Sequence, residues 1–436
     1  MISFEFLFDF LVLLCILYFA RLFIINFLFL RAEKNEKIGK YEKALINYRY
    51  LTFLYPSNLY DIYNSIGNCF SEIKDYKSAE IYYNKAISII PDNFVSYKNL
   101  GLNFLDSKNY KEAHKYFSKS LRLKHGIPYN EDEKYLENFV LNEDDKIIIT
   151  IPKIKHDIEQ LDYLINRNLL PSSFIEEKEN LESLYAYLDD KSEIFFINLE
   201  NDKRKYIESI YERNLYIYKT KDLNEYINKN IEVNNIKTEF EKNEVAYFDN
   251  FLSDECLNEI RNFCFSSTIW HEYKRVWGYL SANLDNGLSD PIFYKIAEEA
   301  INKFPTVFKD YNLMNMWAFK YDSSMKGVSV HADEAFININ FWITNDDANL
   351  DKNTGGLIVY PIKAPDNWTF EEYNADEKLI YDYIKTKEIE TITIPYKENR
   401  CIIFNSAFFH ETDKFNFKEG YENRRINITL LFGKRS

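Results

Sequence analysis

The first third of the chain repeats itself at a regular interval, and this interval restricts the folds that the segment can adopt. The pattern Tyr-x-x-Ala begins at Tyr41, Tyr76 and Tyr110, which are 35 and 34 residues apart. Pro56 and Pro91 follow the first two copies, and proline interrupts a helix because it lacks the backbone N–H group. A repeat of this length predicts helical hairpins that bury their apolar faces by stacking on one another.

A small residue precedes each pattern, in the segment expected to form the other helix of the hairpin. These residues are Ala32, Gly67 and Gly101, and their size lets two helices cross closely. The period and the pattern resemble the tetratricopeptide repeat over residues 25–126. The resemblance implies an α-solenoid of three repeats whose concave face binds a protein or peptide partner. A structural spacer or a dimer surface is the alternative use of such a segment.

An apolar stretch covers residues 6–30, with Asp9, Arg21 and Asn26 as its polar exceptions. About 20 apolar residues suffice to span a bilayer as a helix. Four basic residues follow the stretch, namely Arg31, Lys34, Lys37 and Lys40. By the positive-inside rule, we expect residues 1–24 to form a single membrane anchor and the rest of the chain to lie on the cytoplasmic side of the membrane. The alternative is a first helix that packs on the next repeats.

The charge balance argues against one class of partner. The chain has 54 Lys and Arg against 68 Asp and Glu, for a net charge of −14, whereas a nucleic-acid-binding surface needs an excess of basic residues. Five cysteines are scattered without a CxxC pair, which is typical of a reducing compartment and argues against a disulfide scaffold or a structural zinc site. We therefore expect no nucleic-acid partner.

Residues 127–240 show no recognisable chemistry and are expected to form a connecting α+β region. One helix is predicted from apolar residues that recur at helical spacing, namely Ile154, Ile158, Leu161 and Leu164. A second helix is predicted at residues 223–230. Part of this region is expected to cover one side of the domain that follows.

Residues 241–436 read as short strands separated by glycine turns, which predicts an all-β sandwich or barrel. Within them, the segment 327–333 ends in the pattern His331-x-Asp333. Residues two apart on a strand point to the same face, so both side chains can reach one point. His410, at the end of another predicted strand, would complete a set of two histidines and one carboxylate, which suits non-haem Fe(II).

The order of these features resembles the 2-oxoglutarate- and Fe(II)-dependent dioxygenases, in particular their prolyl-hydroxylase-like branch. Over residues 241–436 the resemblance implies a double-stranded β-helix (jelly roll), with Fe(II) bound by His331, Asp333 and His410. It implies 2-oxoglutarate and O2 as cosubstrates, and no catalytic residue beyond the ligands of metal and cosubstrate. The whole chain is then expected to be a multidomain α+β protein, a solenoid followed by a jelly roll.

The resemblance also implies a cosubstrate pocket, in which a late arginine binds the far carboxylate of 2-oxoglutarate. Arg425 is favoured over Arg424, because Arg425 shares a strand face with Asn427. Asn427 stands where the family often has Ser or Thr, and the arginine lies 15 residues after His410, farther than is common. Three further residues are expected to line the pocket, or else to pack the barrel: Tyr321, Asn340 and Trp342.

The sequence therefore predicts a hydroxylase of an unidentified substrate, for which a protein recruited by the repeats is a candidate. The main alternative is a repeat-based scaffold with a non-catalytic jelly roll, and the retention of all the ligands counts against it. A cupin-like hydrolase or isomerase with another divalent metal is a third hypothesis, which the late arginine disfavours. Gly355 and Gly356 are expected to serve a turn and no more.

Overall fold

The computed structural model describes residues 4–132, 147–189, 197–198, 201–274, 279–322 and 325–435. The chain forms two compact units, Met1–Lys124 and His125–Ser436, and each has its own core. Most of the connecting region predicted at residues 127–240 thus belongs to the same compact unit as the β domain.

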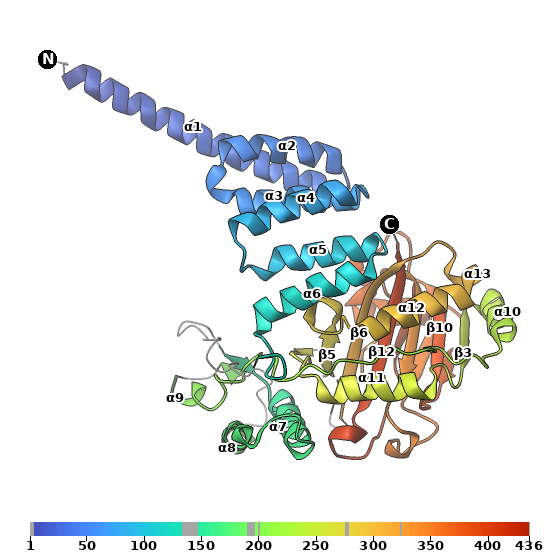
Figure 1. Cartoon of the computed structure of the whole chain (residues 1–436). Coiled ribbons are helices and arrows are strands. Elements are labelled where there is room, and N and C mark those ends of the chain that lie inside the picture. The colour runs from blue at the N-terminus through green and yellow to red at the C-terminus, as the bar shows by residue number, and fades with distance from the viewer. Residues whose placement is uncertain are drawn as a thin grey trace. The chain divides into compact units, whose positions relative to one another are not determined.

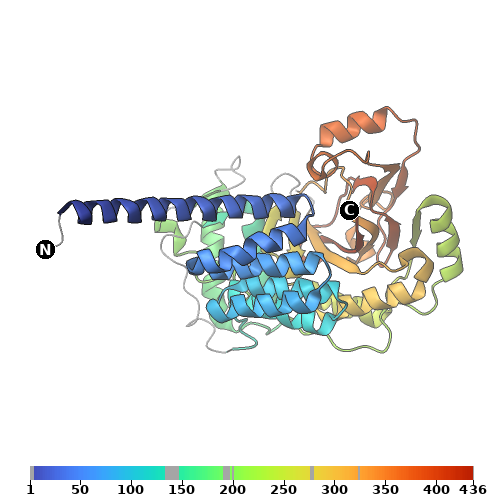
Figure 2. The ribbon, with the colours of Figure 1, turned by 90° about the horizontal axis from the view of Figure 1, so that it is seen from above.

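The first unit consists of three helical hairpins whose helices lie side by side (Figures 1 and 2). Each Tyr-x-x-Ala pattern opens the second helix of a hairpin, so the predicted α-solenoid is confirmed. The helices are α1 (Phe4–Lys37), α2 (Tyr41–Leu54), α3 (Leu59–Glu72), α4 (Tyr76–Ile89), α5 (Phe94–Asp106) and α6 (Tyr110–His125).

Small residues allow the close approach of the two helices in each hairpin. A Cβ atom on Gly67 would lie 2.5 Å from the ring of Tyr83, and one on Gly101 would lie 2.7 Å from the ring of Phe117. The aromatic ring of the second helix therefore fills the space that any other side chain would need. In the first hairpin, Ala32 is fully buried.

Helix α1 is continuous and contains both the apolar stretch and the first helix of the solenoid. Its outer apolar side chains are largely exposed, and Phe19, for example, is 67% exposed. Packing within the solenoid begins farther along, where Ile25 and Ala32 are buried. Residues 8–37 are long and apolar enough to cross a membrane.

Residues 241–436 of the second unit form two antiparallel sheets in the described part of the chain (Figure 1). The larger has the order β3 (Val245–Phe248), β10 (Cys401–Asn405), β7 (Ala335–Trp342), β12 (Arg425–Lys434), β6 (Leu313–Tyr321), β5 (Tyr279–Asn283) and β4 (Glu272–Lys274). The smaller has the order β11 (Phe408–Thr412), β8 (Leu357–Lys363) and β9 (Ile392–Ile394).

A core of the β domain lies between the two sheets. Buried side chains of the larger sheet, such as Val245 and Phe404, pack with Val359 and Ile394 of the smaller one. Two antiparallel sheets with a shared apolar core form a sandwich, so the predicted fold class, helical repeats followed by a jelly roll, is confirmed.

Helices cover the outer surfaces of the sheets. The larger sheet carries α11 (Asp254–Ser266), α12 (Pro291–Lys303) and the short α13 (Pro305–Phe308) (Figure 1). Between β8 and β9 the chain forms α14 (Phe370–Asn374) and α15 (Glu377–Lys385). Ile380 and Ile384 of α15 pack in a small cluster with Phe409 of β11, which links this insertion to the strand of His410.

The connecting region forms α7 (Ile151–Asn166), α8 (Ile175–Asp189), α9 (Asn201–Arg204), α10 (Val233–Asn243) and a two-residue ladder of β1 (Ile148–Ile149) with β2 (Ile197–Asn198). The first predicted helix corresponds to α7.

The prediction of a helix at residues 223–230 is wrong. There the backbone N–H groups of Tyr226 and Ile227 donate to the Glu299 carboxylate at 3.3 and 2.8 Å, and Asn228 donates to the Phe251 carbonyl at 2.9 Å. These partners from distant segments replace the bonds that a helix would supply.

A partly buried ion pair joins α7 to the β domain. Arg424, only 2% exposed, donates from Nε to Glu159 of α7 at 2.8 Å. Beside it, fully buried Lys320 of β6 donates to the Tyr421 hydroxyl at 3.0 Å. Removing one partner of such a pair would leave the remaining buried charge poorly compensated. This contact therefore holds the connecting region on the jelly roll.

The close helix crossing gives a stability prediction. Gly67→Ala places a methyl group against the Tyr83 ring, and we expect a loss of about 1–3 kcal/mol in the free energy of unfolding of the repeats, the usual result of overpacking. The measurement is urea unfolding followed by far-UV circular dichroism. Asn84→Ala, at an exposed position of α4, is the control. Equal stability of the two variants would contradict the packing argument.

Candidate metal centre

The backbone brings the two histidines of the predicted centre together. His331 and His410 form an isolated antiparallel bridge, in which the His331 N–H donates to the His410 carbonyl at 3.0 Å and the His410 N–H donates to the His331 carbonyl at 2.8 Å. The backbone N–H of Asp333 donates to the Ser406 carbonyl at 2.9 Å. The segment that leads into β7 is therefore attached at two points to the segment around β11.

The three side chains converge on one point. Their potential ligand atoms all lie within 4.8 Å of one another. The Nε2 atoms of His331 and His410 lie 3.7 and 3.5 Å from the two carboxylate oxygens of Asp333. Asp333 and His410 are buried, whereas His331 is partly exposed and marks the accessible side.

Hydrogen bonds select the ring nitrogen that each histidine can offer to a metal. Nδ1 of His331 lies 2.8 Å from the Ser329 carbonyl, and Nδ1 of His410 lies 3.0 Å from the Phe408 carbonyl. A carbonyl oxygen only accepts, so each Nδ1 carries the proton and each Nε2 keeps its lone pair. Such an orienting bond to the second ring nitrogen is usual for histidines that bind metals.

The electrostatics of the site favour a neutral His331 and an ionised Asp333. Burial, together with the neighbouring His410, lowers the pKa of His331 to about 4. Burial alone would raise the pKa of Asp333, but its interaction with His410, with smaller contributions from His331 and Asn338, brings that pKa below its usual value. Two imidazoles that each offer Nε2 and one carboxylate are a donor set that binds a divalent ion such as Fe(II) and leaves positions open.

Asn338 is a functional candidate that the sequence analysis missed. Its side-chain amide donates to Asp333 Oδ2 at 2.8 Å and so orients the carboxylate. The available signal was its position two residues before Asn340 on β7, which puts both side chains on the inner face of the strand.

A pocket adjoins the three ligands, and most of the predicted cosubstrate residues lie in it. Arg425 of β12 is directly opposite Tyr321 of β6 in the strand register. Asn427, Asn340 and Thr429 line the same pocket, which is completed by Trp317, Phe319, Val328, Asn338, Leu357, Glu411 and Thr412. The triad and Arg425 thus border one cavity.

The guanidinium of Arg425 is held in place but retains donors. Nε donates to the Gly355 carbonyl at 2.7 Å, Nη2 donates to the Gly356 carbonyl at 3.1 Å, and Nη1 donates to Asn427 Oδ1 at 3.2 Å. An arginine has five N–H groups, so one remains on each terminal nitrogen. The Tyr321 hydroxyl has no hydrogen-bond partner in the described part of the chain. Two parallel N–H groups with an adjacent hydroxyl suit a carboxylate.

The glycine pair therefore does more than make a turn. Its two carbonyls fix the arginine, and a Cβ on Gly356 would lie only 1.8 Å from the Ile394 carbonyl. The position of Gly356 therefore has no room for a side chain. The prediction that these glycines serve only the turn is wrong.

Two other residues lie outside the pocket lining. Trp342 is fully buried in the core between the sheets, and its ring lies 5.6 Å from the Arg425 guanidinium carbon, so it supports the arginine from behind. Arg424 points the other way and contacts Asp322 and Glu159. Neighbouring residues on a strand alternate in direction, which explains the opposite environments of the two arginines.

The pocket is tight in this conformation. Its volume is about 20 Å³, which suffices for about one water molecule. A five-carbon dicarboxylate enters only if lining side chains move. Trp317 and Phe319 are partly exposed and stack on each other with ring centroids 5.9 Å apart, so they are the side chains best placed to turn outward.

Comparisons with known proteins support the repeat assignment. Residues 60–93 match the family model of the tetratricopeptide repeat. No curated protein matches the chain. Among solved structures, the first tetratricopeptide repeat domain of Spaghetti (RPAP3), bound to an HSP90 peptide, is 22% identical and covers 23% of this chain and 79% of its own, with a TM-score of 0.22.

Other solved structures align with the second unit. The non-haem α-ketoglutarate-dependent epimerase SnoN from nogalamycin biosynthesis is 10% identical over 47% of this chain and 85% of its own, with a TM-score of 0.35. A prolyl-4-hydroxylase from Pseudomonas putida is 10% identical over 47% of this chain and 100% of its own, with a TM-score of 0.30. At these values neither likeness assigns an activity to this chain.

The hydrogen bond to Asp333 leads to a metal-binding prediction. Asn338→Ala removes the donor that orients the carboxylate, and we expect the affinity for a divalent metal to fall by about 10–100-fold, as for other residues that orient a ligand. His410→Ala removes a ligand and is expected to abolish binding. Isothermal titration with Mn(II) measures both effects, with His114→Ala, on repeat helix α6, as the control. Wild-type affinity in His410→Ala would refute the assignment of the centre.

Proposed function

We propose that residues 241–436 form an Fe(II)- and 2-oxoglutarate-dependent dioxygenase that hydroxylates its substrate. The observation that carries this proposal is a single cavity with a metal-binding triad at one end and an arginine with two unused N–H groups at the other. The two ends match the two functional groups of a cosubstrate that binds metal through one end and a cation through the other.

Each residue has a defined task in this proposal. His331, Asp333 and His410 hold Fe(II), and Arg425 with the Tyr321 hydroxyl holds the far carboxylate of 2-oxoglutarate. The bound metal and cosubstrate supply the activation of O2 that oxidises a C–H bond. The apolar and aromatic wall of the cavity excludes water from this reaction, and the partly exposed edge of His331 is the side from which substrate approaches.

The burial of Arg425 supports a carboxylate ligand. Burial lowers the pKa of this guanidinium, although Tyr321 and Tyr396 oppose the shift. Its three bonded acceptors are two carbonyls and an amide oxygen, none of which neutralises the charge. The Asp413 carboxylate interacts with Arg425 electrostatically but is not among its hydrogen-bond acceptors. A buried cation without a directly bonded counter-ion is unfavourable, and the cosubstrate carboxylate would provide one. A non-catalytic scaffold would not require a buried arginine whose guanidinium keeps two N–H groups without an acceptor.

The repeats are proposed to bind a protein or peptide, which brings the substrate to the β domain. Solenoids of this kind present extended surfaces to partners.

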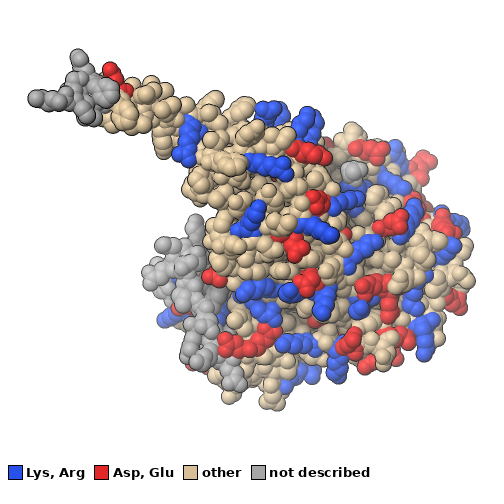
Figure 3. All heavy atoms as spheres, turned by 45° about the horizontal axis from the view of Figure 1, so that its top comes forward, with Lys and Arg blue, Asp and Glu red and all other residues tan. Residues whose placement is uncertain are grey.

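We further propose that α1 anchors the protein in a membrane, with the remainder on the cytoplasmic side. Arg21 does not lie in the middle of the proposed span, because its Nε and Nη2 donate to the Leu54 carbonyl at 3.1 and 2.8 Å, at the end of α2. The 17 residues from position 4 to position 20 form a helix about 26 Å long, close to the ~30 Å of a hydrocarbon core. In Figure 3 the described side chains of this part of α1 are mostly tan, which means that few of them are charged.

The two neighbouring arginines form a matched pair for testing the cosubstrate site. Arg425→Lys keeps the charge but loses the planar fork. We expect the affinity for 2-oxoglutarate to fall by about 10–100-fold, which corresponds to the loss of a charged hydrogen bond. Arg424→Lys should leave that affinity unchanged, because Arg424 contacts Glu159 and Asp322 outside the cavity.

The measurement is the dependence of succinate formation on 2-oxoglutarate concentration, with Fe(II) present, together with direct binding to the Mn(II) form. His331→Ala should abolish succinate formation. The proposed activity fails if the wild-type protein forms no succinate or if His331→Ala forms as much as the wild type.

The anchor has its own test. Deletion of residues 1–20 retains Arg21 and its contact with α2, so the repeats should remain folded. We expect the full chain to sediment with membranes after a carbonate wash and the deletion variant to stay in the supernatant. Full-length protein in the supernatant would rule out the anchor and leave the enzymatic proposal untouched.

A further inference from the structure

Strand β3 lies at the edge of the seven-stranded sheet and has one unpaired side. It pairs with β10 and with no other strand of the described chain. The Asn405 N–H donates to the Glu244 carbonyl at 2.9 Å, so Glu244 faces β10. Backbone groups alternate in direction along an antiparallel strand, and those of Val245 and Tyr247 therefore point away from the sheet. No described residue forms a hydrogen bond with them there.

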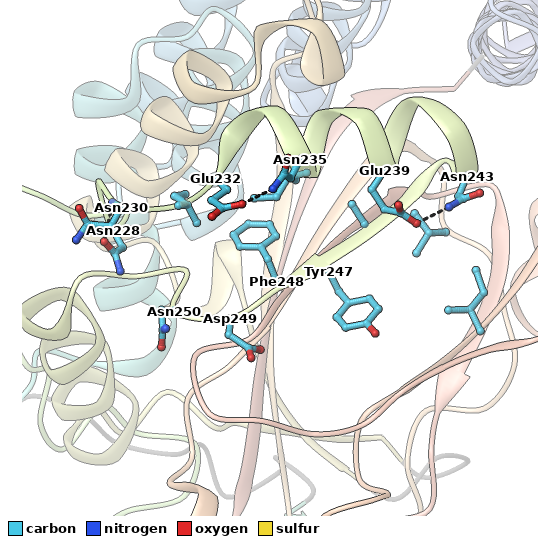
Figure 4. A pocket seen from close by; sticks show the side chains of 15 residues that line it. Asn228, Asn230, Glu232, Asn235, Glu239, Asn243, Tyr247, Phe248, Asp249 and Asn250 are labelled. Carbon is cyan, nitrogen blue, oxygen red and sulfur yellow. Dashed lines mark hydrogen bonds between the residues drawn. The ribbon is translucent and has the colours of Figure 1, made fainter.

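A groove lies between this free edge and helix α10 (Figure 4). Its volume is about 660 Å³, within the range of ligand-binding pockets. Figure 4 shows Tyr247 and Phe248 of β3 on one side and side chains of α10 on the other. Tyr247 is 50% exposed, so the groove is open to partners.

The side of α10 that lines the groove is unusually polar. Glu232, Asn235, Glu239 and Asn243 follow one another along this side at helical spacing, and Ile236 is the one buried residue of the helix. A helix that packs on a sheet normally turns an apolar stripe toward it. Packing of α10 against the sheet therefore does not explain why these four positions are polar.

The lining has the chemistry to bind a peptide backbone and cations. Side-chain amides occur along its length, from Asn228, Asn230, Asn235, Asn243 and Asn250. The lining contains three carboxylates and no Lys or Arg. Asp249 is neutralised by Lys397 and Arg400 at 2.6 and 2.7 Å. Glu232 and Glu239 instead bond to the neutral amides of α10, so their negative charge remains available.

We propose that this groove binds an extended, lysine- or arginine-bearing segment of a partner protein, which pairs as an additional strand with Val245–Tyr247. An exposed strand edge offers the backbone hydrogen bonds for such strand addition. Glu232 and Glu239 select for positive side chains on the added strand. The second unit as a whole is acidic, with 37 Lys and Arg against 56 Asp and Glu in residues 125–436, and so attracts a basic segment.

The groove is close to the metal centre but does not depend on its chemistry. Val245 pairs with Phe404 of β10, and the Phe404 ring lies 4.9 Å from the His410 ring. A segment bound along β3 therefore has one end near the strands that carry the centre. The binding proposal stands or falls independently of the proposed dioxygenase activity.

The test is a selection of random dodecapeptides, displayed on phage, against the full-length protein. We expect enriched peptides to be rich in Lys and Arg and free of proline in their centre. Tyr247→Pro removes an outward N–H group without touching the bonds to β10, and edge strands tolerate proline. It should weaken binding of an enriched peptide at least tenfold. Tyr247→Ala, which keeps the N–H group, should weaken binding much less.

Two further experiments test the same proposal without the Tyr247→Pro variant. N-methylation of alternate backbone nitrogens of the enriched peptide should abolish its binding to the unaltered protein. The double variant Glu232→Gln and Glu239→Gln should weaken binding at least tenfold at low salt, while Glu241→Gln, which lies outside the groove lining, should not.

The proposal is overturned if no peptide is enriched, if the enriched peptides are acidic, or if they bind Tyr247→Pro as tightly as the wild type. It is also overturned if the protein dimerises and Tyr247→Pro abolishes the dimer, because the occupant of the edge is then a second copy of this chain.

Discussion

Two backbone hydrogen bonds between His331 and His410 are the contacts on which the candidate centre depends. They connect the segment that leads into the larger sheet with a strand of the smaller one. Because both partners of the bridge are themselves potential ligands, the contact that closes the two sheets also sets the distance between their imidazoles. Each ring is then oriented by a carbonyl two residues earlier in its own segment, so the metal-facing nitrogen follows from backbone geometry.

The neighbouring arginines show how strand alternation divides structural from functional charge. Arg424 lies on the outer face of the sheet, where Glu159 and Asp322 balance its charge and hold α7 on the β domain. Arg425 faces inward, where carbonyls fix its position without balancing its charge. Both guanidinium groups are almost completely buried, yet only the inward one retains capacity for a carboxylate. This difference is the physical basis of the proposed cosubstrate site.

The central strands of the larger sheet and its edge strand β3 have different roles. Its centre, β7, β12 and β6, supplies the inward residues of the pocket, and its β3 edge is free and faces a polar helix. A free edge is usually a risk of aggregation, and here α10 lies beside it without satisfying its backbone groups. The proposed pairing of a basic partner strand with β3 would explain both the unpaired edge and the acidic residues of α10 beside it.

The sequence by itself determined the features that depend on local spacing. The strand expected to carry His331 and Asp333 is not observed, because both residues precede β7 and His331 forms only an isolated bridge with His410. The 34- and 35-residue interval, however, is sufficient to predict the stacked hairpins, and strand alternation separates Arg425 from Arg424. These inferences need only the periodicities of helix and strand. Tertiary structure alone decided that Asn338 orients Asp333, that the carbonyls of the glycine turn hold Arg425, and that residues 223–230 are not helical. Each depends on a partner that only folding brings within hydrogen-bonding distance, and no local pattern records such a partner.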